Sequence, residues 1–188
     1  MADSDSISKS RLRDRLAATE LPKDPTDVVM PAESADWPAT MREQLTAELK
    51  PAGVLVPLME KASGDLHVLL TQRSAELKLH AGQISFPGGR MEGHDADIAA
   101  TALRETHEEV GIATEQVSVL GYLEPMPTVT GYAVTATVGL VREGASIVVD
   151  RNEVEYAFEV PLPFLLSADN ALLVEREVYG KTIRMVEY

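Results

Sequence analysis

The sequence predicts an α/β sandwich in which helices pack against a mixed β-sheet. Two strand-like segments precede a central amphipathic helix, further strand-like segments follow it, and a short helix lies late in the chain. Strands on both sides of a central helix are typical of a sheet covered by helices. The 188 residues suit one domain with a sizeable core. The 45% hydrophobic and 25% charged residues lie close to the globular average.

The first 50 residues are interpreted as a helical and irregular extension without recognisable chemistry. Helix-forming spacing predicts a helix over residues 6–18, and prolines 22, 25 and 31 then mark an irregular stretch. A second short helix is predicted over residues 38–49, with Pro38 in its first turn, where a missing N–H is tolerated. We expect the main domain to span residues 51–188.

The main domain begins with a predicted hairpin. Residues 54–58 and 66–70 are rich in Val and Leu and are separated by the turn residues Ser-Gly-Asp at 63–65. A Gly/Pro loop at residues 86–89 then leads to a helix predicted from residue 95 or 96 to residue 110, with Asp95 as its N-cap and Gly111 as its stop. The remaining predicted elements are strands over residues 117–123, 133–141, 172–179 and 182–188, and a short helix over residues 162–166.

Composition and charge exclude several classes of protein. The chain has no cysteine, which removes disulfides, thiolate metal sites and cysteine nucleophiles. A formal net charge of −13 repels nucleic acid and anionic membranes, so neither is an expected partner. The longest apolar run, residues 51–59, is too short to span a bilayer, and the N-terminus lacks the pattern of a signal peptide, so a cytoplasmic protein is expected. An acidic protein that handles a polyphosphate would need imported positive charge, which divalent cations ordinarily supply.

The predicted central helix carries three glutamates in its last two turns. Its apolar stripe, suited to packing on a sheet, consists of Ala99, Leu103, Thr106 and Val110. Glu105, Glu108 and Glu109 fall on roughly the opposite side, where spacings of three and four place like charges together at about 0.2–0.5 kcal/mol per pair. They also lie at the negative end of the helix dipole.

Two local rules are therefore broken at one place, which is typical of a functional site, and a hard divalent cation would turn the repulsion into attraction. Helix spacing alone fits a solvated acidic face equally well. The loop before the helix and Arg104, which can pair with a neighbouring glutamate, favour the metal site.

These residues resemble the Nudix box, which reads Gly, five residues, Glu, seven residues, Arg-Glu-apolar-x-Glu-Glu-x-Gly-apolar. The matching positions are Gly89, Asp95 and the run Arg-Glu-Thr-His-Glu-Glu-Val-Gly-Ile at 104–112. The chain departs from the pattern at three points: the first acidic residue is Asp95, one extra residue precedes Arg104, and Thr106 replaces an apolar residue.

The resemblance implies a Nudix-type α/β/α sandwich around a mixed sheet and a metal-dependent pyrophosphohydrolase. Mg²⁺ or Mn²⁺ would be held by Glu105, Glu108 and Glu109 with a carbonyl of Gly88 or Gly89, and Glu105, Glu109 and Arg104 would serve catalysis. In this family a carboxylate outside the box often acts as general base. Glu153 and Glu155 are the candidates, with Glu153 preferred; the alternative for each is a surface residue.

Two segments before the box resemble the extended signature of the coenzyme A pyrophosphatase subgroup. They are Leu-Leu-Thr-Gln-Arg-Ser at 69–74 and His-Ala-Gly-Gln-Ile-Ser-Phe-Pro-Gly-Gly at 80–89, and the subgroup also carries the one-residue insertion. The implied reaction is hydrolysis of coenzyme A or its thioesters to 3′,5′-ADP and 4′-phosphopantetheine. The implied substrate-binding residues are Arg73, Ser74, His80, Gly82, Gln83 and Phe86.

Four of these positions also have an ordinary structural interpretation. Arg73, with Lys78 or His80, would give a diphosphate fixed cationic donors. The alternatives are a strand-end arginine paired to a carboxylate, a loop histidine bonded to backbone, a turn-capping Ser74 and a Phe86 that fills the core.

Two rival functions remain open at this point. One is a Nudix hydrolase of another nucleoside diphosphate derivative, such as ADP-ribose or NADH. The other is a non-catalytic Nudix-fold binding module, whose usual mark, the loss of the box glutamates, is missing here. Homodimerisation is an expectation from the family alone. Members of the subgroup generally continue into a further helix, so we expect the domain to be truncated at Tyr188.

Overall fold

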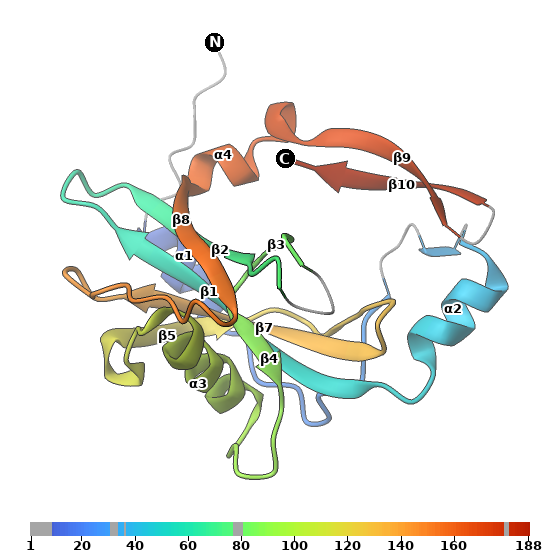
Figure 1. The fold of residues 1–188 in the computed structure, drawn as a ribbon, viewed down its shortest axis with the longest axis horizontal. Coiled ribbons are helices and arrows are strands. Elements are labelled where there is room, and N and C mark those ends of the chain that lie inside the picture. The colour runs from blue at the N-terminus through green and yellow to red at the C-terminus, as the bar shows by residue number, and fades with distance from the viewer. Residues whose placement is uncertain (1–8, 31–33, 36, 77–80, 179–180) are drawn as a thin grey trace.

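The computed structural model describes residues 9–30, 34–35, 37–76, 81–178 and 181–188. An eight-stranded mixed sheet forms its centre, with a separate two-stranded hairpin beside it (Figure 1). In the sheet, β1 (Lys50–Glu60) and β7 (Tyr132–Val141) run parallel, from Lys50 opposite Tyr132 to Met59 opposite Val141. The other pairings are antiparallel, as in a sheet assembled from hairpins around one crossover.

The predicted first hairpin is confirmed. β1 pairs antiparallel with β2 (Leu66–Arg73), and Gly64 in the turn has a φ of +86°, which favours glycine. β1 begins at Lys50, four residues before the predicted start, because its first half pairs with both β7 and β4 (Gly88–Arg90).

Four strands were not predicted. They are β3 (Ile84–Ser85), β4, β6 (Met126–Pro127) and β8 (Val154–Pro161). Three of them have only two or three residues, too few to show an alternating pattern. β8 is long, but its burial does not alternate: it pairs with β2 and leaves most of its side chains half-buried or exposed.

The central helix, α3, spans Ile98–Val110, and its predicted N-cap is wrong. Asp97, not Asp95, caps the helix by accepting a 2.8 Å hydrogen bond from the Ala100 N–H. Asp95 is unsuited to this role because its carboxylate is bound by Arg104. The predicted stop is confirmed, since Gly111 has a φ of +74° and its N–H donates to the His107 carbonyl.

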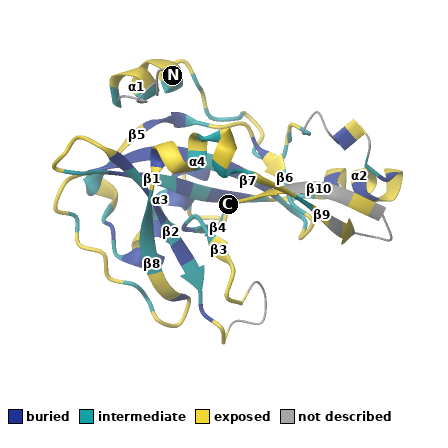
Figure 2. Ribbon diagram, turned by 90° about the horizontal axis from the view of Figure 1, so that it is seen from above, coloured by how far each residue is buried: buried dark blue, intermediate teal, exposed yellow. Residues whose placement is uncertain are grey.

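Adjacent residues of the central strands face opposite cores, as alternation in a strand requires. Leu58, Val68 and Leu140 belong to a core that also receives Leu12, Leu16 and Leu165 of helices α1 (Lys9–Leu16) and α4 (Leu162–Leu166). Met59, Leu69 and Val141 belong to the other core, with Val110 of α3. Figure 2 shows that buried residues lie along the central strands of the sheet. Helices thus cover both faces, which confirms the predicted α/β/α sandwich.

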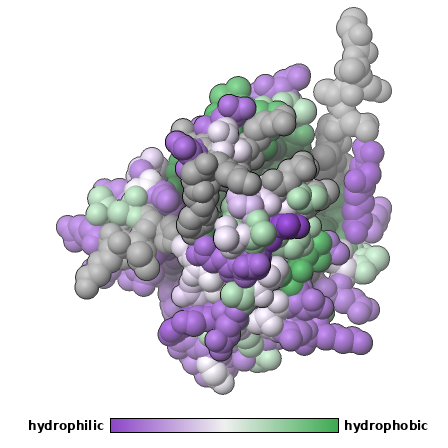
Figure 3. All heavy atoms as spheres, turned by 90° about the vertical axis from the view of Figure 1, so that its right-hand side faces the viewer, coloured by the Kyte–Doolittle hydropathy of each residue, from purple (hydrophilic) through white to green (hydrophobic). Residues whose placement is uncertain are grey.

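Three further elements, β5 (Val117–Tyr122), β9 (Leu172–Val178) and β10 (Lys181–Glu187), agree with the predicted ones to within one residue at their described ends. The helix α2 (Ala39–Thr46) begins one residue after its predicted start and ends three residues before its predicted end. β9 and β10 form the separate hairpin, and α2 lies near its far end (Figure 1). The face that carries α2 is mainly hydrophilic (Figure 3). In the part of the chain that the structure describes, no helix is both long and apolar enough to cross a membrane.

The N-terminal segment is attached to the sheet at several points. The Tyr122 N–H donates to Thr19 Oγ1 at 2.8 Å, the Val29 N–H donates to the Pro125 carbonyl at 2.8 Å, and Lys9 pairs with Glu60. The division of the chain near residue 50 stays a prediction.

Candidate active site

The three glutamates of α3 have very different environments. The side chain of Glu109 is 2% exposed, that of Glu105 15%, and that of Glu108 54%. The prediction that all three lie opposite the packed stripe is therefore wrong for Glu109, which lies among the buried residues. The buried face is rotated toward Ala102, which is fully buried, and Leu103 is only half-buried. Small residues at this contact let α3 approach the sheet closely enough to cover a carboxylate.

Two glycines bring the strands against α3. Gly53 of β1 pairs with Gly89 of β4, and a Cβ on Gly53 would lie 2.4 Å from the Ile98 carbonyl oxygen. A Cβ on Gly89 would lie 2.5 Å from the carboxyl carbon of Glu105. At Gly53 a side chain would collide with the main chain of α3, and at Gly89 it would displace the Glu105 carboxylate. The Glu105 carboxylate is therefore held directly against the main chain of the loop that the sequence singled out.

Arg104 links three carboxylates. Its Nε and Nη2 donate to the two oxygens of Asp95 at 2.9 and 3.0 Å, a bidentate pair. Its Nη1 donates to Glu105 Oε1 at 2.8 Å and to Glu108 Oε2 at 2.9 Å. Hydrogen bonds from Arg104 lower the pKa of Asp95 well below its ordinary value. Asp95 also accepts from the Glu92 N–H and the Thr101 hydroxyl, so the arginine is held by a fixed anion.

Glu109 is a buried carboxylate with weak compensation. Arg73 Nη1 lies 3.5 Å from its Oε1, and its Oε2 has no hydrogen-bond partner among the described residues. Burial, opposed by the charge of Arg73 and reinforced by the charges of Glu153 and Glu105, raises the pKa of Glu109 to about 7. Burial likewise raises the pKa of Glu105, although Arg104 opposes the shift.

Glu153 is the last residue of the turn before β8. Its charge contributes to the raised pKa of both Glu105 and Glu109. Its main-chain carbonyl accepts a 2.8 Å hydrogen bond from the Ser74 N–H. Glu155, the other candidate, is exposed two residues further along β8.

The residues fit a divalent cation by donor chemistry. Carboxylate and carbonyl oxygens are the ligands of Mg²⁺ and Mn²⁺, and the crowding of Glu105 and Glu109 with an unpartnered Oε2 is what a cation would relieve. Among the described residues, no group of three His, Asp or Glu side chains is already arranged to hold an ion. One oxygen of Glu105 and one of Glu108 accept hydrogen bonds from Arg104 Nη1 instead.

The other predicted binding residues lie around the end of β2. Ser74 is buried and its hydroxyl accepts from the Glu76 N–H at 3.4 Å, the geometry of a turn cap. The main chains of Gly82 and Gln83 pair with that of Arg73. Phe86 packs against the core that holds Leu58, in agreement with the core interpretation. His80 and Lys78 lie outside the described residues.

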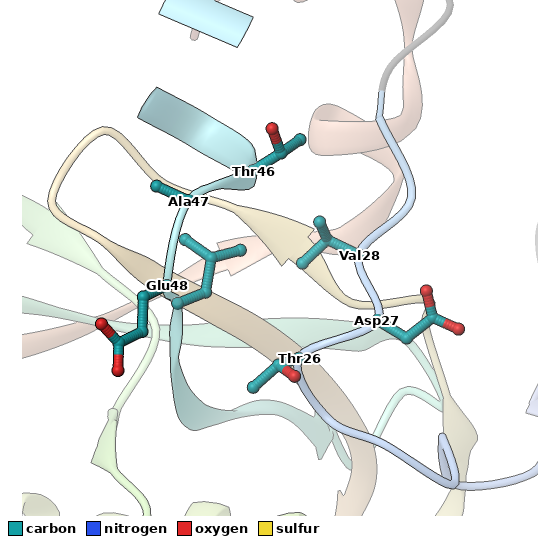
Figure 4. Close-up of a pocket in the computed structure, with 7 residues that line it drawn as sticks. Thr26, Asp27, Val28, Thr46, Ala47 and Glu48 are labelled. Carbon is teal, nitrogen blue, oxygen red and sulfur yellow. The ribbon is translucent and has the colours of Figure 1, made fainter. Parts of the chain in front are cut away.

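Three described cavities lie away from this site. One, of about 520 Å³, is lined by Thr26, Asp27 and Val28 on one side and by residues 46–49 on the other (Figure 4). Its charged residues are Asp27 and Glu48, both acidic, so it is unsuited to a diphosphate. Two smaller cavities lie beside residues 19–29 and likewise contain none of the predicted site residues.

Sequence reasoning missed the residues that hold the site in place. Asp97 and Thr101 fix the start of α3 and the Asp95 carboxylate, and residues 148–150 bond to the end of α3. An Asp-x-Asn turn signal at 150–152 was visible in the sequence, but nothing in the pattern linked it to the glutamates.

Comparison with known proteins agrees with this fold. The NUDIX domain family matches residues 49–178. A protein of Citrobacter koseri described as the uncharacterized Nudix hydrolase NudL is 44% identical over 125 residues, which cover 65% of this chain and 64% of the relative. Its Escherichia coli counterpart is 42% identical with the same coverage. The chain thus matches slightly less than two thirds of the length of these relatives.

A solved structure shows the same fold. The Nudix hydrolase RenU of M. smegmatis aligns with a TM-score of 0.51 and 23% identity, covering 61% of this chain and 71% of the other. The family match, which spans well over half of the chain and includes the glutamate cluster of α3, identifies the protein as a member of the Nudix family.

Proposed function

We propose that this chain is a metal-dependent pyrophosphohydrolase whose site is built on the C-terminal half of α3. The observation that carries the proposal is the crowding of the Glu105 and Glu109 carboxylates, the second almost fully buried with an oxygen that lacks a partner in the described structure. Burying a carboxylate with an unsatisfied oxygen costs about 1–3 kcal/mol or more of desolvation free energy. Such an unfavourable local arrangement is typical of a functional site.

Each residue has a role that its position supports. Glu105, Glu108 and Glu109, with the main chain of Gly88 and Gly89, would hold the cation. The bound Mg²⁺ or Mn²⁺ would supply positive charge against the diphosphate oxygens and favour deprotonation of water. Asp95 holds Arg104, and Arg104 holds Glu105 and Glu108 in register along the helix.

Glu153 is proposed as the general base. Two observations support this role: Glu153 is exposed, so it can accept a proton and return it to solvent, and its charge acts on both Glu105 and Glu109. The water oxygen forms a bond to one phosphorus, its proton passes to Glu153, and the bond from that phosphorus to the bridging oxygen breaks. The bridging oxygen leaves with the second phosphate.

The hydrolase proposal is tested by a pair of isosteric variants. Glu109→Gln and Glu105→Gln should lower kcat by roughly 100-fold or more with Mn²⁺ or Mg²⁺ at saturating substrate, because each removes a charge from the ligand set. Glu115→Gln, in the 3₁₀ turn after α3 and exposed, is the matched control and should keep full activity. Wild-type rates in Glu105→Gln and Glu109→Gln would exclude catalysis through this helix.

We further propose coenzyme A or an acyl-coenzyme A as the substrate, with 3′,5′-ADP and (acyl-)4′-phosphopantetheine as products. The support is the signature at residues 69–89 and the position of Arg73, whose Nη1 approaches Glu109 while its buried Nε has no partner among the described residues. An arginine with spare donors beside the carboxylates is suited to a phosphate oxygen.

A substrate panel tests this second proposal separately. We expect coenzyme A to give the highest kcat/KM, and product analysis after reaction in ¹⁸O-labelled water to show which phosphate gained the oxygen. Arg73→Gln should raise KM for coenzyme A by roughly tenfold, the loss of one charge-assisted contact. A clear preference for ADP-ribose or NADH would remove the coenzyme A proposal and leave the hydrolase proposal standing.

A further inference from the structure

The segment before β8 is fixed to the end of α3. The Val148 N–H donates to the Val110 carbonyl at 2.9 Å, and the Asp150 N–H donates to the Glu109 carbonyl at 3.0 Å. Carbonyls in the last turn of a helix have no partner within the helix, so these bonds satisfy them from outside. The segment passes so close that a Cβ on Gly111 would lie 3.0 Å from the Val148 carbonyl oxygen. Val149 packs into the core beside α3.

A tight turn follows, built on the Asp150 side chain. Asp150 Oδ1 accepts hydrogen bonds from the Asn152 N–H at 2.9 Å and from Asn152 Nδ2 at 2.8 Å. The Asp150 carbonyl accepts from the N–H groups of Glu153 and Val154 at 3.0 and 2.8 Å. Aspartate and asparagine favour such turns because their side chains replace a main-chain acceptor. The turn ends at Val154, which is fully buried.

The same turn is tied to β2 on its other side. The carbonyl of Glu153 accepts from the Ser74 N–H, and Ser74 follows Arg73, whose guanidinium contacts the Glu109 carboxylate. These contacts form a closed loop. The Glu109 carbonyl bonds Asp150, and the turn leads from Asp150 to Glu153. Glu153 bonds Ser74, and the neighbouring Arg73 contacts the Glu109 carboxylate. Both ends of the turn are held by the elements that hold Glu109.

We propose that Asp150 is a positioning residue for Glu153: its carboxylate, by accepting two hydrogen bonds from Asn152, sets the turn that carries Glu153 between the end of α3 and the end of β2. This inference rests on the proposed function, in which Glu153 is the general base. In the described structure, the hydrogen bonds of the Asp150 side chain go to Asn152 and to none of the proposed cation ligands, so we expect it to act by setting the turn that carries Glu153.

The test compares Asp150→Ala with Asp150→Asn. Alanine removes both side-chain hydrogen bonds, and we expect kcat to fall roughly 10- to 100-fold with an unchanged KM, as for a misplaced catalytic group. Asparagine keeps the Oδ1 acceptor without the charge and should restore kcat to near the wild-type value. Asn152→Ala, which removes only one of the two bonds, should give a smaller loss in the same direction if Asp150→Ala folds poorly.

Asp24→Ala is the matched control. Asp24 Oδ1 also accepts two hydrogen bonds, from the N–H and the hydroxyl of Thr26, but in a turn that contains none of the site residues. This variant removes an equivalent turn and should leave kcat unchanged. A loss of kcat in Asp24→Ala equal to that in Asp150→Ala would show a general effect on stability and would overturn the positioning role.

Two other results would also overturn it. Equal loss of kcat in Asp150→Asn and Asp150→Ala would show that catalysis requires the charge of Asp150 rather than its hydrogen bonds. A wild-type kcat in Asp150→Ala would show that catalysis does not require the turn. In a Glu153→Gln background, Asp150→Ala should add no further loss, because both changes act at one step. If Glu105→Gln stays active, the proposed function fails; if it is inactive while Asp150→Ala is fully active, only this inference fails.

Discussion

Replacing Glu109 by glutamine should stabilise the protein in a chelator, although the same change should greatly lower kcat. The carboxylate is 2% exposed, one oxygen lacks a partner among the described residues, and its pKa is raised to about 7 from 4.5. An acid whose folded pKa is raised binds its proton more tightly in the folded state. Its contribution to stability is therefore complete below the unfolded pKa and is lost as the pH rises through the folded pKa.

The size of the effect follows from the shift. At about 1.4 kcal/mol per pKa unit, ionisation of Glu109 should cost the metal-free fold up to about 3 kcal/mol above pH 7. Glutamine carries no charge and keeps an acceptor toward Arg73, so the variant should escape most of this cost. We expect Glu109→Gln to unfold at a similar urea concentration to the wild type near pH 4.5 and to be about 2–3 kcal/mol more stable at pH 8.

The assay is equilibrium urea unfolding of both proteins with EDTA across this pH range. The difference between the two free energies of unfolding isolates Glu109, since other groups titrate in both proteins. Addition of Mn²⁺ should then stabilise the wild type and not the variant. A difference in the free energy of unfolding that does not change with pH would refute the interpretation of Glu109 as a carboxylate that destabilises the fold when ionised. A variant less stable than the wild type at pH 8 would refute it as well.

Two further predictions concern the supports of the site. Asp95→Asn should lower the free energy of unfolding by about 2–3 kcal/mol at pH 7, because it leaves Arg104 without its bidentate partner. Since the folded pKa of Asp95 is depressed, that deficit should shrink in urea unfolding as the pH falls below about 4, and a constant deficit would contradict it. Gly89→Ala should reduce kcat by roughly tenfold or more by displacing the Glu105 carboxylate, whereas Gly93→Ala, with open space around its Cβ position, should not. Similar rates for the two alanine variants would remove the argument for a glycine at position 89.

The fold was largely predictable because its long elements carry clear patterns. The hairpin of β1 and β2, the helix α3 with its glycine stop, and α4 all follow from hydrophobic periodicity and turn residues. The short strands β3 and β4 could not be predicted, since a pair of residues joins a sheet through main-chain bonds that leave no mark in the sequence. β8 was missed because an edge pairing with β2 lets its side chains stay partly exposed.

The sequence predicted which glutamates cluster on α3, but it did not predict which of them is buried. Periodicity assigned Leu103 to the packed stripe and Glu109 to the opposite face, whereas the structure buries Glu109 and leaves Leu103 half-buried. The difference arises from the close approach of α3 to Gly53, which depends on long-range pairing of β1 with β4. A sequence pattern gives the spacing of side chains along one helix, but the direction from which the sheet meets that helix is a tertiary property.

The glutamates near the C-terminal end of α3 explain why this half of the helix needs stabilising contacts from several other segments. Negative charge at the C-terminal end of a helix is opposed by the helix dipole and by its own repulsion, which together favour local fraying. Here the last carbonyls are bonded by the segment at 148–150 and Arg104 is held by Asp95, while Gly53 lets the first half of the helix pack closely on the sheet. Each of these contacts stabilises the helix without neutralising Glu109. The fold therefore keeps an unfavourable charge in a fixed position, and a cation bound there would recover that energy as affinity.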